Sequence, residues 1–184
     1  MRVISGSARG KKLGELSGNE TRPTTDRVKE GLFNAIQFEV PGAVVLDLFA
    51  GTGQLGIECL SRGAERAVFV DSRKDAVDLI RRNLAMTRMQ DRAQVVQADA
   101  ISWLAGCRTR FDLIFLDPPY GSGLLESSMR RIMEIDILSK NGIIICESRH
   151  EAVLPERIGS LARYREYRYG KIKVTTFRTE DSMT

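Results

Sequence analysis

The sequence predicts an α/β fold, with a mostly parallel β-sheet that finishes in an antiparallel hairpin. In its middle part, short apolar runs alternate with segments of about 10–15 residues that have helical periodicity, a pattern typical of βαβ units and a parallel sheet. Near its end, two strand-like runs meet at Gly170, which favours an antiparallel hairpin. The length of 184 residues suits one domain with at most a small appendage.

The middle of the chain is expected to supply five strands and the helices between them. Each strand is a short run of strand-forming residues that is followed by turn residues or by a helical segment. The expected strands are Val44–Phe49, Arg66–Asp71, Ala93–Gln97, Phe111–Asp117 and Gly142–Glu147. The expected helices are Gln54–Arg62, one that reaches Leu84 with Ala76, Val77 and Ile80 on one face, and one that carries Leu124, Met129, Ile132 and Met133. The hairpin is expected to pair Tyr164–Tyr169 with Lys171–Arg178.

The first 40 residues are expected to form a separate unit, which leaves residues 41–184 as the main domain. Val3–Ser7 and Lys11–Leu16 can pair as a hairpin around the turn at residues 8–10. A helix follows, with Thr24 or Thr25 placed as its N-cap. Its apolar face contains Val28, Leu32, Ala35 and Ile36, and Pro41-Gly42 closes the unit.

The composition excludes several classes of protein. Hydrophobic residues make up 42% and charged residues 28%, so a packed core is expected. No apolar run approaches the roughly 20 residues that cross a bilayer, and the start of the chain does not resemble a signal peptide, so a cytoplasmic protein is expected. The three cysteines have no CxxC spacing and are expected to be buried or inert thiols. A single histidine, His150, cannot supply a zinc site or a Ser-His-Asp triad, so no metal is expected and His150 is expected at the surface.

Basic residues gather toward both ends of the chain. Residues 1–30 hold seven basic and four acidic residues, and residues 163–178 hold six basic residues and one acidic residue. The remainder holds 15 basic and 19 acidic residues. This asymmetry favours a polyanion-binding face built from the termini. A solvated surface with chance clustering is the alternative.

A glycine-rich motif follows the first expected strand. Residues 51–56, GTGQLG, match G-x-G-x-x-G at the start of a helix, and Asp71 lies 20 residues after Gly51 at the tip of the next strand. Glycines let the backbone approach a ligand closely, and a carboxylate at this strand tip can accept hydrogen bonds from ribose hydroxyls. The match fits a nicotinamide dinucleotide as well as S-adenosylmethionine, and a tight turn without a ligand is the structural alternative.

Three features favour S-adenosylmethionine over a dinucleotide. Asp47 lies just before the glycines, where a carboxylate suits a cationic amino-acid group and repels a pyrophosphate. Asp99 ends the third strand segment and could accept a hydrogen bond from an adenine amino group, although an N-cap for the helix after it is equally compatible. No separate domain of useful size follows to hold a hydride acceptor. The predicted cofactor site comprises Asp47, Phe49, Gly51, Gly53, Asp71, Ser72, Asp99 and Ala100.

The stretch DPPY, residues 117–120, ends the fourth expected strand and resembles the catalytic motif of methyltransferases that alkylate a ring-conjugated exocyclic amine. The lone pair of such a nitrogen is delocalised, so acceptors aimed at its N–H groups favour a pyramidal nitrogen and stabilise its developing positive charge. Asp117 would supply a carboxylate and Pro118 a carbonyl, with Pro119 keeping that carbonyl rigid, while Tyr120 would stack on the base. The alternative is a Pro-Pro turn with a packed tyrosine.

The chain resembles the bacterial 16S ribosomal RNA guanine-N2 methyltransferase family over roughly residues 1–178. The segments that carry the resemblance are ISGSARGKKL, TRPTTDRVKEGLFNAI, LDLFAGTGQLGIECLSRGA, FLDPPYGSGLLE and YRYGKIKVTTF. The resemblance implies a Rossmann-like, seven-stranded methyltransferase sheet with an added N-terminal β-hairpin and helix. It also implies S-adenosylmethionine as methyl donor and one guanine of small-subunit rRNA as acceptor, either free or within the subunit or an assembly intermediate. Family members often carry Glu where this chain has Asp71, whose shorter side chain implies a weaker or shifted ribose contact.

Two other functions remain open on sequence alone. DPPY also occurs in DNA adenine-N6 methyltransferases, but 184 residues leave little room for a region that reads duplex sequence. A non-catalytic RNA-binding module is the other alternative, and the intact DPPY tip argues against it. Basic residues near the two ends of the protein and at the entrance of its pocket are predicted to clamp the RNA backbone. These residues are Arg2, Arg9, Lys11, Lys12, Arg22, Arg168 and Lys171.

Overall fold

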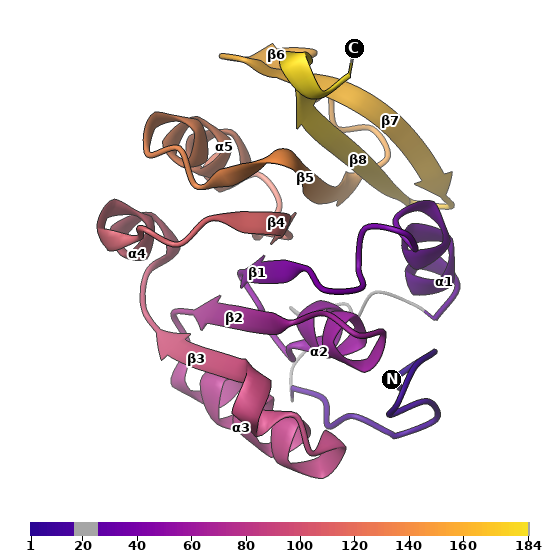
Figure 1. The fold of residues 1–184 in the computed structure, drawn as a ribbon. Helices are drawn as coiled ribbons and strands as arrows, with labels where there is room; N and C mark the ends of the chain where they lie inside the picture. The colour runs from indigo at the N-terminus through magenta and orange to yellow at the C-terminus, as the bar shows by residue number, and fades with distance from the viewer. Residues whose placement is uncertain (17–25, 184) are drawn as a thin grey trace.

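The computed structural model describes residues 1–16 and 26–183, which fold around one central sheet (Figure 1). The sheet has eight strands in the order β3-β2-β1-β4-β5-β8-β7-β6. The strands are β1 (Val44–Leu48), β2 (Arg66–Asp71), β3 (Ala93–Gln97), β4 (Phe111–Leu116), β5 (Leu138–Arg149), β6 (Arg157–Ile158), β7 (Leu161–Tyr169) and β8 (Ile172–Thr179). The helices are α1 (Asp26–Ala35), α2 (Gln54–Ser61), α3 (Lys74–Thr87), α4 (Ala100–Gly106) and α5 (Leu124–Glu134), with 3₁₀ turns at Gln90–Arg92 and Glu180–Ser182.

The predicted mixture of parallel and antiparallel pairing is confirmed. Strands β1 to β5 pair in parallel, whereas β5–β8, β7–β8 and β6–β7 are antiparallel. Gly170, with φ +61°, makes the turn between β7 and β8. The expected number of seven strands is wrong, because β6 adds a two-residue strand that pairs with β7. Two residues are too few to show a periodicity, so the sequence pattern does not reveal β6.

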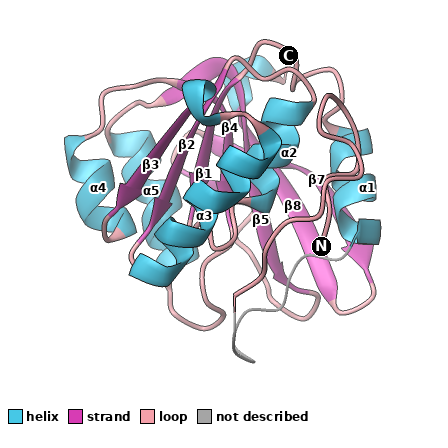
Figure 2. Ribbon diagram, turned by 90° about the horizontal axis from the view of Figure 1, so that it is seen from below, coloured by secondary structure: helices cyan, strands magenta, loops and turns pink. Residues whose placement is uncertain are grey.

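Helices cover both faces of the sheet (Figure 2). Helices α1, α2 and α3 bury Leu32, Ile57 and Ile80 in one hydrophobic cluster, which also contains Val3 and Leu13 of the N-terminal segment. Helices α4 and α5 bury Leu104, Met129 and Ile132 in a second cluster on the opposite face. Because the central strands are covered on both sides, their residues are almost all buried, as expected for a parallel sheet.

The third glycine of the G-x-G-x-x-G motif brings α2 close to the sheet. A Cβ atom built at Gly56 would lie 2.3 Å from the Phe69 ring of β2. No side chain can be accommodated at that separation without moving the helix or the ring. Gly56 therefore sets the distance between α2 and β2, and with it the position of the loop that precedes the helix.

The N-terminal hairpin is less regular than the sequence suggests. Its two arms run antiparallel, but they share a single bridge between Arg2 and Lys12 instead of forming strands. The backbone N–H groups of Ile4 and Ser5 donate to the carboxylate of Glu58 on α2, at 2.8 and 3.0 Å, so they do not pair with the other arm. The N-cap expected at Thr24 or Thr25 lies outside the described residues.

A buried ion-pair network holds this N-terminal segment on the domain. Lys29 of α1 is fully buried, and its Nζ lies 3.7 Å from Glu58 Oε2 and donates to the carbonyl of Arg2. Arg62 Nε donates to Glu58 Oε1 at 2.9 Å. Burial lowers the pKa of Lys29, and the charge of Glu58 opposes that shift. One carboxylate thus joins α1, α2 and the start of the chain.

Within residues 1–16 and 26–183, no helix is long and apolar enough to cross a membrane. All three cysteines, Cys59, Cys107 and Cys146, are buried free thiols, and His150 is exposed, as predicted.

Candidate active site

The five parallel strands direct their carboxyl ends to one edge of the sheet. Their order places β1 beside β4, although β1 and β2 are consecutive in the chain, so the sheet changes its winding direction between β1 and β4. Ligands of open α/β sheets bind at such a switch point, outside the carboxyl ends of the strands. Along the chain, every predicted cofactor and catalytic residue lies in or just after the carboxyl half of one of these strands.

The loop after β1 has a backbone that turns sharply at three positions. Phe49, Gly51 and Gly53 have φ values of +72°, +56° and +76°. A positive φ is strained for phenylalanine, and two neighbouring hydrogen bonds hold it: the N–H groups of Phe49 and Ala50 both donate to the Val70 carbonyl, at 3.0 and 2.9 Å. Strand β1 thus ends at Leu48, one residue earlier than expected.

Asp71 links the tip of β2 to the glycine-rich loop. Its Oδ2 accepts the N–H of Gly51 at 2.8 Å, and its Oδ1 accepts the N–H of Arg73 at 2.9 Å. Each carboxylate oxygen has two lone pairs, so one acceptor position on each oxygen is still compatible with a ligand hydroxyl. The side chain therefore shapes the loop, in addition to the ribose contact that the sequence predicts for it.

Asp47 is buried beneath the same loop. It is 3% exposed, and its Oδ2 accepts the N–H of Gly56 in the first turn of α2 at 3.0 Å. Burial raises its pKa to about 7, the hydrogen bond from Gly56 opposes this shift, and the charge of Asp71 adds to it. The carboxyl group is thus poised to respond to a nearby positive charge.

The third strand contributes Asp99, which is the N-cap of α4. Its side chain accepts the N–H of Ser102 at 2.9 Å, and this hydrogen bond is the main reason that its pKa is lowered. This confirms that Asp99 is an N-cap, one of the two roles that the sequence left open for it. Ser72 and Asp99 are exposed at the strand tips, and Ala100 is buried.

The register of the sheet brings a second carboxyl group beside Asp117. Leu116 of β4 pairs with Leu48 of β1 and with Cys146 of β5, so Asp117 follows β4 next to Phe49 on one side and Glu147 on the other. Burial raises the pKa of Asp117 well above its ordinary range, and the charges of Glu147 and Asp47 raise it further. Three carboxyl groups from β1, β4 and β5 thus meet at this edge of the sheet.

The DPPY segment forms a rigid lip beyond β4. Pro118 is buried, whereas Pro119 and Tyr120 are exposed, Tyr120 by 47%. Ser122 closes the turn, because its hydroxyl donates to the Pro119 carbonyl at 2.7 Å and accepts the N–H of Leu124 at 3.3 Å. The turn therefore leads directly into α5 and holds Tyr120 at the surface.

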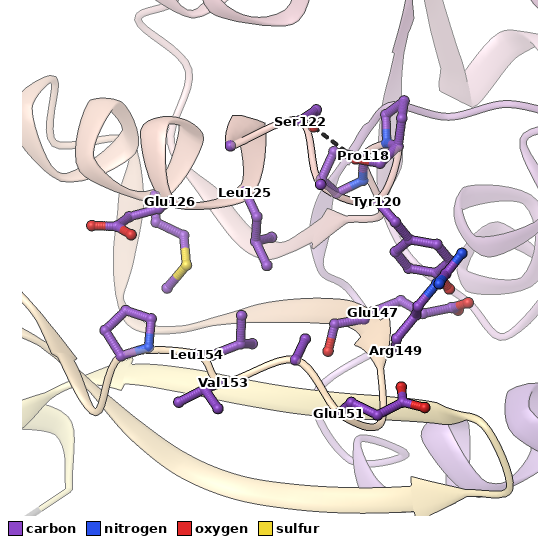
Figure 3. A pocket seen from close by; sticks show the side chains of 17 residues that line it. Pro118, Tyr120, Ser122, Leu125, Glu126, Glu147, Arg149, Glu151, Val153 and Leu154 are labelled. Atoms are coloured by element: carbon purple, nitrogen blue, oxygen red, sulfur yellow. Dashed lines mark hydrogen bonds between the residues drawn. The ribbon is translucent and has the colours of Figure 1, made fainter.

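A cavity of about 540 Å³ opens beside this lip (Figure 3). One wall is Pro118, Pro119 and Tyr120 of the DPPY segment with the start of α5, and the other is the end of β5 with the loop at residues 151–155. Arg149 places its guanidinium 5.1 Å from the centroid of the Tyr120 ring, a cation–π distance. Glu147 and Arg149 line this cavity, and neither was among the predicted site residues. A carboxylate at the end of a buried apolar run was the available signal for Glu147, as it was for Asp71 and Asp117.

The predicted RNA-contacting residues have different surroundings. Arg9, Lys11 and Lys12 are exposed on the N-terminal hairpin, and Arg2 beside them pairs with Asp26 at 2.9 Å. Met1, at the start of that hairpin, accepts a weak hydrogen bond from the Thr52 hydroxyl, so the basic segment begins next to the glycine-rich loop. Arg22 lies outside the described residues.

The basic C-terminal strands are less available than their sequence suggests. Arg168 and Lys171 are exposed, but Arg168 pairs with Glu166 at 3.2 Å. Lys173 is buried and donates to the Ala152 carbonyl at 2.6 Å, and Arg178 pairs with Glu39 at 2.9 Å. Several basic side chains of this segment therefore bind to other groups of the protein and are less available to RNA.

Comparisons with known proteins identify the family. The family model described as Conserved hypothetical protein 95 matches residues 1–178. YlbH of Bacillus subtilis (strain 168) is 43% identical over 181 residues, which cover 97% of this chain and 98% of that protein. Ribosomal RNA small subunit methyltransferase D of Escherichia coli (strain K12) is 36% identical over 180 residues, or 98% of this chain and 90% of that protein.

A solved structure agrees with these sequence relatives. The structure of yhhF from Escherichia coli superimposes with a TM-score of 0.88 at 34% identity, and the match covers 98% of both chains. The resemblance predicted from the sequence motifs is thus confirmed over nearly the whole length. The chain belongs to the Conserved hypothetical protein 95 family and is a relative of the ribosomal RNA small subunit methyltransferases D.

Proposed function

We propose that this protein transfers a methyl group from S-adenosylmethionine to the exocyclic N2 amine of a guanine in small-subunit ribosomal RNA. The observation that carries the proposal is the DPPY tip of β4, where Asp117 lies next to Glu147, and where Glu147, Pro118 and Tyr120 line the adjoining cavity. The names of its relatives, which are ribosomal RNA small subunit methyltransferases, support the choice of RNA.

The residues at the strand ends fit S-adenosylmethionine better than a dinucleotide. Asp47, Asp71 and Asp117 place negative charge around the glycine-rich loop, and burial already disfavours the ionised forms of Asp47 and Asp117. A pyrophosphate would increase this repulsion, whereas a sulfonium and an ammonium group would relieve it. In this proposal Asp71 holds the ribose, Asp47 and the loop at residues 49–53 face the amino-acid end, and Ser72, Asp99 and Ala100 border the adenine.

The DPPY tip supplies acceptors for the target amine. When bound, S-adenosylmethionine would supply an electrophilic methyl group and would leave as S-adenosylhomocysteine once its bond from sulfur to that methyl breaks. The alkylated nitrogen would then lose one proton, for which the Asp117 carboxylate is an acceptor. The Asp117 carboxylate and the Pro118 carbonyl accept the two N–H groups of the amine, which turns its lone pair away from conjugation with the ring and stabilises the positive charge that develops on nitrogen. A positive charge nearby lowers the pKa of Asp117, so the carboxylate form that accepts hydrogen bonds is favoured when the site is filled. Tyr120 stacks on the base.

A methyl-transfer assay tests the proposal. Purified protein is incubated with S-adenosylmethionine carrying a labelled methyl group and with unmodified small-subunit rRNA, isolated small subunits, duplex DNA or no nucleic acid. The nucleic acid of each sample is then digested to nucleosides, and the labelled product is identified by mass spectrometry. We expect N2-methylguanosine from rRNA or from the subunit. Labelled N6-methyladenine from DNA, or no transfer to any nucleic acid, would overturn the proposal and favour one of the two alternative functions.

A further inference from the structure

The wall of the cavity opposite the DPPY segment presents two charges of opposite sign. Glu147 and Arg149 are two residues apart on β5, and alternate residues of a strand point to the same side of a sheet. Both line the cavity, Glu147 with 8% of its surface exposed and Arg149 at the rim. Figure 3 shows them together with Tyr120 at one end of the cavity, with Leu125, Val153 and Leu154 further along it.

This arrangement combines a stacking surface with a donor and an acceptor. Tyr120 offers an aromatic face that Arg149 covers at 5.1 Å. A volume of about 540 Å³ lies within the range of pockets that hold small organic ligands, and the apolar residues suit the faces of a flat ring. A base that is rotated out of an RNA strand needs these features: a place to stack and polar groups for its edge.

The edge of guanine matches the two charges, and the edge of adenine does not. Along its Watson–Crick edge, guanine carries an acceptor at O6 and donors at N1 and N2, so a carboxylate can accept N1–H while a guanidinium donates to O6. Adenine carries an acceptor at N1, which would face the carboxylate without a hydrogen between them. That contact is unfavourable, because two acceptors in a partly buried site repel each other and both lose water.

We infer that the cavity is the binding site for the target base and that Glu147 selects guanine by accepting its N1–H, with Arg149 moving from the Tyr120 ring to the O6 side of the base. This inference rests on the proposed function. It assigns different tasks to the two adjacent carboxyl groups: Asp117 accepts from the amine that is methylated, and Glu147 reads the neighbouring ring nitrogen.

Two substitutions at position 147 separate recognition by charge from recognition by shape. Glu147→Gln keeps the size of the side chain but removes its charge and half of its acceptor capacity, whereas Glu147→Asp keeps the carboxylate and shortens the side chain. Loss of charge next to Asp117 relieves repulsion, so the Gln variant should fold with an unchanged or higher melting temperature. Glu156→Gln, on an exposed side chain outside the cavity, is the matched control.

The measured quantities are kcat/KM for methyl transfer to unmodified small-subunit rRNA and the affinity for S-adenosylmethionine by titration calorimetry. We expect Glu147→Gln to lower kcat/KM by about 10- to 100-fold, the usual effect of a base-edge contact, with cofactor affinity unchanged. Glu147→Asp should retain more activity than Glu147→Gln, and Glu156→Gln should match the parent.

Several results would overturn the inference and leave the proposed function intact. These are full activity of Glu147→Gln, a Gln variant that is more active than the Asp variant, or loss of cofactor affinity in Glu147→Gln, which would place the residue in the cofactor site. Failure of the parent protein to methylate guanine in rRNA would instead be a failure of the proposed function itself. The parent assay therefore distinguishes the two cases before any variant is compared.

Discussion

At the scale of single residues, the chemistry of this site depends on carboxyl groups that the fold forces close together. Asp47, Asp117 and Glu147 come from three adjacent strands. Burial raises the pKa values of Asp47 and Asp117, the charge of Asp71 adds to the shift of Asp47, and the charges of Glu147 and Asp47 add to that of Asp117. Like charges in a site of low polarity are unfavourable unless a cation joins them. The protein thus keeps an arrangement that a positively charged ligand would stabilise, and this makes its behaviour with pH informative.

The first prediction concerns pH. The pKa of Asp47 in the folded protein, about 7, lies above the value for an unfolded chain, so the folded state binds more protons between about pH 4 and pH 7. The stability of the protein without cofactor should therefore fall as pH rises through that range. Binding of cationic S-adenosylmethionine should release protons and strengthen as pH rises through about 7.

Calorimetric titrations at about pH 6, 7 and 8, in buffers with different heats of ionisation, measure this proton release. Asp47→Asn should make the melting temperature of the protein without cofactor less dependent on pH, because Asn does not titrate. Proton uptake on binding, or an affinity that falls with rising pH, would contradict the assignment of Asp47 to the cofactor site.

The second prediction concerns Asp71. Asp71→Ala removes the proposed acceptor for the ribose and also the partner of the Gly51 N–H. S-adenosylmethionine should bind more weakly by about 1.5–3 kcal/mol, as expected when hydrogen bonds to a charged group are removed. Titration calorimetry measures the affinity, and circular dichroism checks the fold. An unchanged affinity in a folded variant would exclude the ribose contact.

The third prediction separates binding from chemistry. Asp117→Ala should lower the rate of methyl transfer by about 10²-fold or more, because it removes one preorganised acceptor from the reacting amine. Its affinity for S-adenosylmethionine should stay close to that of the parent, since the cofactor contacts proposed above come from β1, β2 and β3. Single-turnover rates at saturating RNA give the comparison, and a rate within a few-fold of the parent would rule out the proposed role.

At the scale of secondary-structure elements, the loop after β1 is positioned by the close approach of α2 to the sheet. The Phe69 ring leaves no room for a Cβ atom at Gly56, whose N–H also binds Asp47. Movement of α2 would therefore disturb both the core and the buried carboxylate. Asn83 of α3 fixes the loop from another side, because its amide donates to the Thr52 carbonyl at 2.9 Å and accepts the Gly14 N–H at 2.8 Å.

The fourth prediction tests this packing. Gly56→Ala should lower the free energy of unfolding by about 1–3 kcal/mol, the usual cost of overpacking, and should also weaken S-adenosylmethionine binding. Gly106→Ala is the matched control, because Gly106 ends α4 and nothing lies within 4 Å of a Cβ built there. Urea denaturation of both variants measures the difference. Equal stability of the two variants would show that α2 is not closely constrained by Phe69.

At the scale of the whole molecule, the two basic ends of the chain differ in whether their charged side chains are exposed or bound to other groups of the protein. Arg9, Lys11 and Lys12 project from a segment anchored through Glu58, and this segment begins beside the glycine-rich loop. At the other end, Lys173 and Arg178 are bound within the protein. We therefore propose that the N-terminal unit, residues 1–40, makes the main contact with the RNA backbone.

The fifth prediction tests that contact by its dependence on salt. Replacing Arg9, Lys11 and Lys12 with Gln should weaken RNA binding across unrelated sequences and leave S-adenosylmethionine affinity unchanged. It should also flatten the plot of log K against log salt, by roughly 0.7 for each phosphate of single-stranded RNA that the variant no longer neutralises. Binding isotherms at several salt concentrations give the slopes.

A matched variant controls for net charge. Replacing Arg108, Arg110 and Lys140 removes the same charge at the amino end of the parallel strands, away from the proposed site, and these residues are also exposed. Its salt slope should stay near that of the parent. If the two triple variants behave alike, the N-terminal hairpin has a structural role only, and the exposed C-terminal residues Arg168 and Lys171 become the alternative RNA contact.

The sequence alone determined the α/β class, the parallel strands, the C-terminal hairpin and the carboxylates at the strand tips. These features depend on local patterns: buried strands are apolar runs, and their ends are followed by Gly, Pro or an acid that can be read directly. Strand β6 was not predictable, because its two residues show no periodicity. The irregular N-terminal hairpin was not predictable either, because the amides of Ile4 and Ser5 donate to Glu58, a partner more than 50 residues away in the chain.

Only the tertiary structure decided which of these residues act together. The order of strands places Glu147 beside Asp117, although 30 positions separate them in the chain, and it brings Arg149 over the ring of Tyr120. Burial and the charges of Glu147 and Asp47 then raise the pKa of Asp117, because desolvation and repulsion between neighbours are properties of the folded site and not of any one residue. A sequence pattern can identify a carboxylate at the end of a strand, but pairing between strands determines its neighbour and hence its chemistry.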